Sequence, residues 1–221
     1  MNCAAFVGYL PGRKSRLLGK IVDLNSLRCL CCYFSLVCLL GSCSLFRVEP
    51  GRFVSSEDRA ALYRIKEWTL RGRIAIQSKD ESLQAGIVWR HDRQQDHLRI
   101  SGPFGRGAAR IVLSQNYIRV TRADGAVEES DDPDRLLHAL LGVSIPIDGL
   151  RYWVLGVSYP GLKADASYDA MGWLRALRQI GWAVDYPEYQ DVESVILPRK
   201  LKISSGDAKL KLVVDGWDIE G

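Results

Sequence analysis

Leu70-Arg71-Gly72-Arg73-Ile74-Ala75-Ile76-Gln77 marks the point at which the spacing of apolar residues along the chain changes. Before it, Ala61, Leu62, Ile65 and Trp68 recur at the three- and four-residue intervals of a helix. From Leu70 onward, apolar and polar residues alternate. A period of two is typical of a strand with one buried face and one face in water. The change therefore predicts a helix followed by a sheet.

The expected helix has a start signal of its own. Ser55 is followed three residues later by Asp58, and this pair has the spacing of a capping box. Residues 43–56 contain a Pro-Gly pair and show no periodicity, so they are expected to form a tether. Residues 57–221 are expected to form a single domain.

Alternating apolar residues continue beyond Gln77, with turn signals between the segments, and they predict an antiparallel meander. The clearest turn is Asp124-Gly125, a two-residue hairpin signal. The first group of strands is expected around Leu83 to Trp89, Leu98 to Ile100, Ile111 to Leu113, Ile118 to Val120, and Val127. The second group is expected at 172–179, 182–189, 199–204 and 208–215, which makes about ten strands in all.

Signals for helices lie between the two groups of strands. Asp132 is a capping residue, Pro133 suits the first helical position, and Gly142 is a stop signal. A second short helix is expected within 150–155, and residues 156–170 have the pattern of a loop. The domain is therefore expected to be mainly β with a few helices: a curved antiparallel sheet whose open side the helices cover.

The cysteines are confined to the start of the chain. Because none follows Cys43, no disulfide is expected in the domain itself. The run from Cys29 to Leu40 is apolar but too short for the about 20 residues that cross a bilayer. It fits a signal peptide with basic residues before it, although a short buried helix ending in Cys is the alternative. The six cysteines are Cys3, Cys29, Cys31, Cys32, Cys38 and Cys43.

Leu40-Gly41-Ser42-Cys43 resembles the lipobox that lipoprotein signal peptidase recognises. We therefore expect residues 1–42 to be a signal peptide and Cys43 to carry a diacylglyceryl group and an N-acyl chain. No other cofactor is expected. Ser44 follows the cysteine, where Asp retains many Gram-negative lipoproteins in the inner membrane. A lipid anchor on the periplasmic face of the outer membrane is the expected location.

Removal of the leader changes the charge of the chain. The full sequence has 30 basic and 26 acidic residues, and residues 1–42 hold five of the basic and one of the acidic ones. The mature chain thus has 25 of each. A nucleic-acid binder needs a basic surface, so nucleic acid is not an expected partner.

Signals for catalysis are few. His91 and His97 flank an expected hairpin turn, and His138 lies in an expected helix. These histidines suit solvated positions better than a metal site or a base pair, because no carboxylate or cysteine stands at ligand spacing. Nucleophile-elbow, zinc-protease and phosphate-loop motifs are not seen. We expect neither an enzyme nor a metal site.

Two other features leave alternatives open. Phe104 lies in a glycine-rich hairpin connection, Ser101 to Gly107, and it could be tucked into the core or exposed as an apolar tip. The chain also has six tryptophans, which could fill a large core or line a pocket for an apolar ligand.

Several motifs occur in an order that resembles the LolB family of outer-membrane lipoprotein receptors. They cover nearly the whole mature chain, from Cys43 to Trp217. They are the lipobox with Ser44; the L-R-G-R-I strand 70–74; the Trp89 strand; G-P-F-G at 102–105; Leu140-Leu141-Gly142 with Ile145-Pro146; L-R-Y-W-V-L-G at 150–156; Gly181-Trp182 with Tyr186 and Tyr189; L-P-R-K-L at 197–201; and K-L-K-L at 209–212 before Trp217.

The resemblance implies an incomplete, half-open antiparallel β-barrel of about eleven strands, with an α-helical lid over an apolar cavity. It also implies a membrane-insertion loop at Phe104, with Pro103 and Gly105 beside it. The family usually has Leu at this tip, so Phe104 keeps the apolar character with another shape. The candidates for the acyl cavity are Ile74, Ile76, Trp89, Leu98, Ile100, Ile111, Leu113, Trp153 and Trp182.

The function that the resemblance implies is transfer of lipoproteins. A LolB-like protein receives them from the periplasmic chaperone LolA, holds their acyl chains and inserts them into the outer membrane. The expected partners are a LolA-like chaperone, the acyl chains of the cargo and outer-membrane lipid, and the protein is expected to be a monomer. The alternatives are a lipid-anchored binding module for a small apolar ligand and a structural outer-membrane lipoprotein with a filled core.

Overall fold

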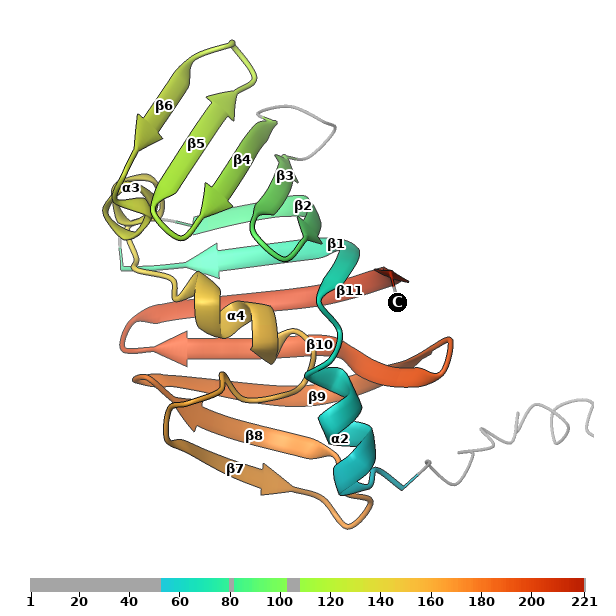
Figure 1. Ribbon diagram of the computed structural model, residues 1–221. Coiled ribbons are helices and arrows are strands. Elements are labelled where there is room, and N and C mark those ends of the chain that lie inside the picture. Colours follow the sequence, from blue (N-terminus) through green and yellow to red (C-terminus); the bar gives the residue numbers. More distant parts are fainter. Residues whose placement is uncertain (1–52, 80–81, 103–107, 221) are drawn as a thin grey trace, which may run out of the picture. The chain divides into compact units, whose positions relative to one another are not determined.

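A computed structural model of the chain describes residues 53–79, 82–102 and 108–220. Its main element is one antiparallel sheet of eleven strands (Figure 1). The strands are β1 (Glu67–Gln77), β2 (Ser82–His91), β3 (Asp96–Ser101), β4 (Ala109–Ser114), β5 (Tyr117–Arg122), β6 (Val127–Ser130), β7 (Ala164–Tyr168), β8 (Leu174–Gln179), β9 (Trp182–Val192), β10 (Val195–Ser205) and β11 (Ala208–Glu220).

The strand order joins two meanders at the middle of the sheet. It runs β6-β5-β4-β3-β2-β1-β11-β10-β9-β8-β7, so the first and last strands of the sheet in sequence pair with each other. Within the described residues, β6 and β7 each pair with one strand only, and the sheet does not close. The expectation of a half-open, mainly β fold of about eleven strands is confirmed.

Three helices are described, and α3 and α4 lie over one face of the sheet (Figure 1). They form the connection from β6 to β7, which takes the chain from one edge of the sheet to the other. Within the described residues, no helix combines the length and the apolar character that a membrane crossing needs. The helices are α2 (Ser56–Leu62), α3 (Pro133–Leu141) and α4 (Ile147–Trp153).

The helix ends follow the capping signals. Ser55 and Asp58 form the complete capping box at the start of α2. The Asp132 carboxylate accepts a hydrogen bond from a backbone N–H of α3, and Gly142 ends that helix with a φ of 66°. The first helix is shorter than its apolar stripe predicts: it ends at Leu62, so Trp68 belongs to β1 instead.

Strand β7 is the element that the sequence pattern missed. It lies within 156–170, which we expected to be a loop, and its sequence is ADASY. As an edge strand, it pairs with β8 alone and four of its five residues are exposed. A strand with so little burial has no apolar alternation to mark it, because alternation arises only where one face is buried.

The core lies between the sheet and the helices. The larger apolar cluster extends from α2 across the central strands to α4, and a smaller one joins β4 and β5 to α3. The larger cluster includes the fully buried side chains of Trp68 and Trp153. The Trp68 and Trp89 rings meet edge to face, with their centroids 5.0 Å apart. Both clusters lie within one compact unit, Gly51–Gly221.

A glycine allows the two central strands to approach each other. The register between β1 and β11 shifts at Arg71/Gly72, and a Cβ on Gly72 would lie 2.2 Å from the carbonyl oxygen of Val213. Backbone cannot yield as a side chain can, so Gly72→Ala is expected to lower the free energy of unfolding by about 1–3 kcal/mol. Urea denaturation followed by circular dichroism measures this change.

Gly216→Ala is the matched control for that substitution. Gly216 lies on β11 opposite Arg71, and a Cβ there would have no atom within 4 Å. Equal midpoints for the two variants would contradict the proposed close approach of β1 and β11.

Candidate functional site

An apolar cavity lies between the sheet and helices α3 and α4. Every residue that lines it is apolar, and its volume is about 80 Å³. Strands β1 to β4 supply one side, β10 and β11 supply the floor beside them, and α3, α4 and the segment between them supply the cover. A site without polar groups offers a ligand only the removal of its apolar surface from water.

Most of the residues that we expected to line a cavity come together here. Ile74, Ile76, Trp89, Leu98, Ile100 and Ile111 all line it. Leu113 instead packs with Ile118, Val120 and Leu137 in the smaller cluster. Trp153 and Trp182 lie in the larger core cluster and do not line this cavity. The lipidation residue Cys43 and the loop residues Pro103, Phe104 and Gly105 lie outside the described residues.

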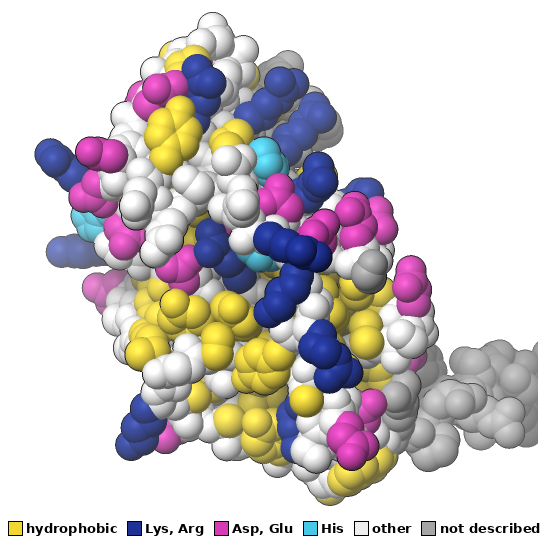
Figure 2. Space-filling view, in the orientation of Figure 1, with side chains coloured by type: hydrophobic (Ala, Val, Ile, Leu, Met, Phe, Trp, Pro, Cys, Tyr) yellow, Lys and Arg dark blue, Asp and Glu magenta, His cyan; other side chains and the backbone are white. Residues whose placement is uncertain are grey.

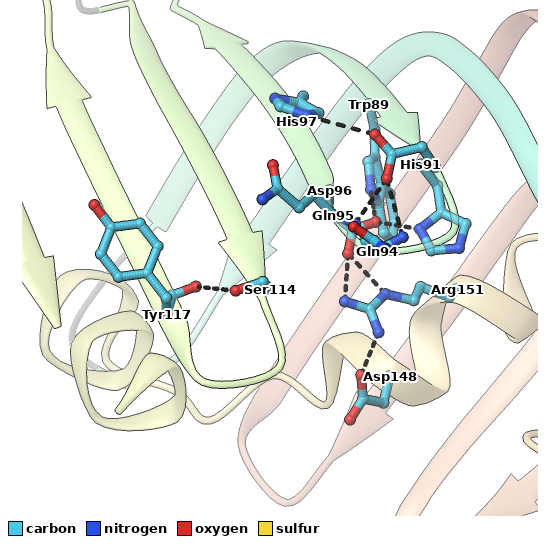
Figure 3. A network of polar contacts seen from close by, with 11 residues as sticks. Trp89, His91, Gln94, Gln95, Asp96, His97, Ser114, Tyr117, Asp148 and Arg151 are labelled. Carbon is cyan, nitrogen blue, oxygen red and sulfur yellow. Dashed lines mark hydrogen bonds and ion pairs between the residues drawn. The ribbon is translucent and has the colours of Figure 1, made fainter. Parts of the chain in front are cut away.

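A buried carboxylate is bonded to the cavity residue Trp89 (Figure 3). Asp96 is 0% exposed. Its Oδ1 accepts a hydrogen bond from Nε1 of Trp89 at 2.7 Å and contacts Nδ1 of His91 at 2.9 Å. Its Oδ2 accepts from Nε of Arg151 at 2.7 Å, and Arg151 also pairs with Asp148 on its own helix. Because a buried charge is costly unless it is paired, these contacts are what make the position of Asp96 tolerable.

The Asp96 network joins the hairpin of β2 and β3 to helix α4. Sequence analysis missed it and expected His91 to be solvated, whereas the His91 side chain is 17% exposed and contacts Asp96. One signal was present in the sequence. Asp96 lies two residues before Leu98 and four before Ile100, so the three side chains point to the same, inward face of β3. A charged residue in an inward register indicates a buried ion pair.

A second polar anchor holds the chain after α4. The side-chain oxygen of Gln179 accepts from Nε1 of Trp153 and from the backbone N–H of Tyr159, at 3.1 and 2.8 Å. The nitrogen of the same amide donates to the carbonyls of Tyr159 and Leu162. Helix α4 is thus tied to both halves of the sheet. Helix α3 packs on the sheet through apolar contacts with β4 and β5, and its N-cap residue Asp132 is hydrogen-bonded to Ser130 at the end of β6.

A larger, open groove lies beside α4 on the far side of the Asp96 network. Its volume is about 970 Å³, and polar and aromatic side chains line it. Figure 2 shows hydrophobic side chains gathered over α4, with basic side chains between this patch and β2 to β4. The groove is formed by the start of β1, the β2–β3 and β4–β5 turns, and one side of α4 with the segment after it.

A few titratable groups in the described part of the chain have shifted pKa values. Burial raises the pKa of Tyr186 and of Tyr189 far above its ordinary value, so both hydroxyls stay neutral. A hydrogen bond from the backbone N–H of Gln94 holds the pKa of Asp92 below its ordinary value in the β2–β3 turn. Within the described residues, His, Cys, Asp and Glu side chains form no group of three that could hold a metal ion.

Comparison with known proteins identifies the family of the chain. The sequence profile described as "Outer membrane lipoprotein LolB" matches residues 66–217, which is most of the domain. The chain belongs to the LolB family. It is 32% identical to a protein named outer-membrane lipoprotein LolB from Halorhodospira halophila, over 81% of this chain and 89% of that relative. A relative of the same name from Pseudomonas fluorescens is 29% identical over 83% of this chain and 93% of its own length.

The cavity therefore lies in a LolB-family fold, between its open sheet and its helices. Among solved structures, a LolA superfamily protein from Nitrosomonas europaea is similar with a TM-score of 0.45 and 7% identity, covering 76% of this chain and 94% of its own. So distant a likeness adds nothing to the assignment of the site. Residues matched by the LolB profile supply nearly the whole sheet, α3, α4 and all the cavity residues named above.

Proposed function

We propose that the chain receives lipoproteins from a LolA-like periplasmic chaperone, holds their acyl chains in the apolar cavity and inserts them into the outer membrane. The observation that carries the proposal is a cavity lined by apolar residues alone, in a protein of the LolB family. Each exposed CH₂ of an acyl chain costs about 0.8 kcal/mol in water, so a carrier has to cover the chains. No catalysis is part of this proposal.

The cavity has to widen to hold acyl chains. Its volume of about 80 Å³ leaves little room for the many CH₂ groups of a long acyl chain. Helix α4 is tied to the sheet by Arg151 and Trp153, whereas the body of α3 packs on it through apolar contacts and only its N-cap, Asp132, is hydrogen-bonded to the end of β6. We therefore expect α3 to move away from the sheet when cargo enters.

The two alternative functions are less well supported. A structural lipoprotein with a filled core has no use for a cavity whose lining is entirely apolar. A small apolar ligand would fit the closed volume, but it does not account for the membership of the LolB family. The receptor proposal accounts for both.

The anchor and its membrane are part of the proposal. The relatives carry the name outer-membrane lipoprotein. Cys43 stands at the end of the expected signal peptide and Ser44 follows it, which supports lipidation at Cys43 and attachment to the periplasmic face of the outer membrane. Residues 43–56 would then tether a monomeric domain, 57–221, to that membrane.

A two-step transfer assay tests the proposed function. The chain is produced from Ser44 onward without its lipid, mixed with a LolA-like chaperone loaded with a labelled lipoprotein, and then added to liposomes. The label should move first to this chain and then to the liposomes. If the label stays on the chaperone, the receptor function is wrong.

The second step of this assay also tests Phe104. A large apolar side chain in a glycine-rich loop suits the boundary between headgroups and acyl chains, where a charge is unfavourable. Phe104→Glu should therefore accept cargo normally but deliver at least about tenfold less to liposomes, which is a cost of about 1.4 kcal/mol. Phe104→Leu, with the residue usual in the family, should deliver normally. Equal delivery by the Glu variant and the wild type would exclude a membrane role for Phe104.

A further inference from the structure

We propose that the groove beside α4 binds the polar head of the cargo lipid: the glycerol esters, the N-acyl amide and the first peptide groups of a lipidated cysteine. This inference rests on the proposed function and names a second subsite for the same ligand. The acyl chains would occupy the apolar cavity, and the head to which they are bonded would lie in the groove outside it.

The groove and the cavity are neighbours. Trp89 lines the cavity, whereas His91 and Arg151 line the groove, and Asp96 bonds to all three. Two consecutive residues directly after α4 line different sites: Val154 lines the cavity, and Leu155 lines the groove. A smaller depression shares residues with both of them. A ligand with apolar chains and a polar head could therefore span the two sites without leaving the surface of the protein.

The donors of the groove match the chemistry of such a head. A triacylated cysteine has lost its free amine and presents ester and amide carbonyls, which accept hydrogen bonds. The groove presents donors: the Lys66 ammonium, the amides of Gln94, Gln115 and Asn116, and the hydroxyls of Tyr152 and Tyr159. Among the described residues, the side chains of Gln115 and Asn116 have no hydrogen-bond partner. They lie in the β4–β5 turn, where they are exposed and available to a ligand.

The charge balance favours this neutral head over a phosphate. Arg151 is paired with Asp96 and Asp148, and Arg93 is paired with Glu67. Among the described residues that line the groove, Lys66 is the remaining Lys or Arg, and Asp148 contributes an anion to the same lining. A phosphate site usually presents uncompensated cations, often arginines in a forked geometry. The groove is better suited to carbonyl oxygens than to a phospholipid headgroup.

The test separates the head from the chains by using three probes. A neutral alkyl probe reports on the cavity alone, and an N-acyl diacylglyceryl cysteinyl-serine amide reports on cavity and groove together. N-acyl phosphatidylethanolamine with the same three acyl chains offers a phosphate head instead. Wild type should bind the lipopeptide more tightly than N-acyl phosphatidylethanolamine. The double variant Gln115→Glu/Asn116→Asp replaces two donors with acceptors of the same shape and should weaken lipopeptide binding about tenfold, while the alkyl probe binds as before.

Gln77→Glu/Gln84→Glu is the matched control. Both glutamines are exposed on β1 and β2, outside the groove and the cavity, and the control adds the same two charges. The control should bind all three probes like the wild type. The inference is wrong if the lipopeptide binds both double variants equally, or if N-acyl phosphatidylethanolamine binds wild type as tightly as the lipopeptide. Failure of the alkyl probe to bind wild type would contradict the proposed function instead.

Discussion

Asp96→Ala is expected to lower the free energy of unfolding by about 3–5 kcal/mol, because it leaves a buried network without its central anion. Arg151 would lose the carboxylate that accepts its Nε hydrogen bond, and the indole N–H of Trp89 would lose its acceptor in the core. A buried donor without an acceptor lowers the stability of the fold by the full free energy of removing that donor from water. Urea denaturation with circular dichroism measures the change.

Asp185→Ala is the control for this loss of a carboxylate. Asp185 is exposed on β9 and lies outside the Asp96 network, so its replacement should leave the denaturation midpoint nearly unchanged. Similar midpoints for the two variants would mean that the Asp96 network does not hold α4 to the sheet.

Ile100→Asp is expected to abolish acyl binding. Ile100 lies on the cavity wall near the end of β3, opposite Ile87 of β2. A carboxylate there would have to leave water or keep water in the cavity, and either outcome opposes entry of an acyl chain. Binding of a fluorescent neutral acyl probe should weaken by well over tenfold, which corresponds to more than about 1.4 kcal/mol.

Val88→Asp introduces the same carboxylate on the other face of the sheet. Val88 is 38% exposed and pairs with Arg99 on β3, so a charge at this position stays in water. The Val88 variant should bind the probe like the wild type. If both variants or neither lose binding, the cavity is not the acyl site. Circular dichroism shows whether each variant is folded before binding is compared.

Local patterns predicted most of the fold. The alternation that begins at Leu70 predicted the central strands, because one face of each is buried, and the caps at Ser55 and Asp132 predicted two helix starts. The same alternation brought Ile74, Leu98 and Ile100 to one face, where they line the cavity. β7 was missed because an exposed edge strand has no such pattern.

The remaining features depend on contacts between distant segments. The pairing of β1 with β11 joins the two ends of the domain, and residue spacing alone does not encode which strands meet. Trp153 shares its apolar character with the cavity residues but lies in the core, where its indole N–H meets Gln179. The Asp96 network likewise needs α4 to fold across the sheet before Arg151 can reach its carboxylate. The groove is built from four separate parts of the chain, namely the start of β1, two hairpin turns and α4 with the segment after it. No single sequence motif could therefore have predicted the groove.

Depletion of the protein from living cells tests most directly whether the chain delivers lipoproteins to the outer membrane. Newly made lipoproteins are labelled during depletion, and the inner and outer membranes are separated and compared. The labelled lipoproteins should accumulate away from the outer membrane, and wild type should restore their location whereas Ile100→Asp should not. An unchanged share of labelled lipoproteins in the outer membrane after depletion would contradict the proposed function.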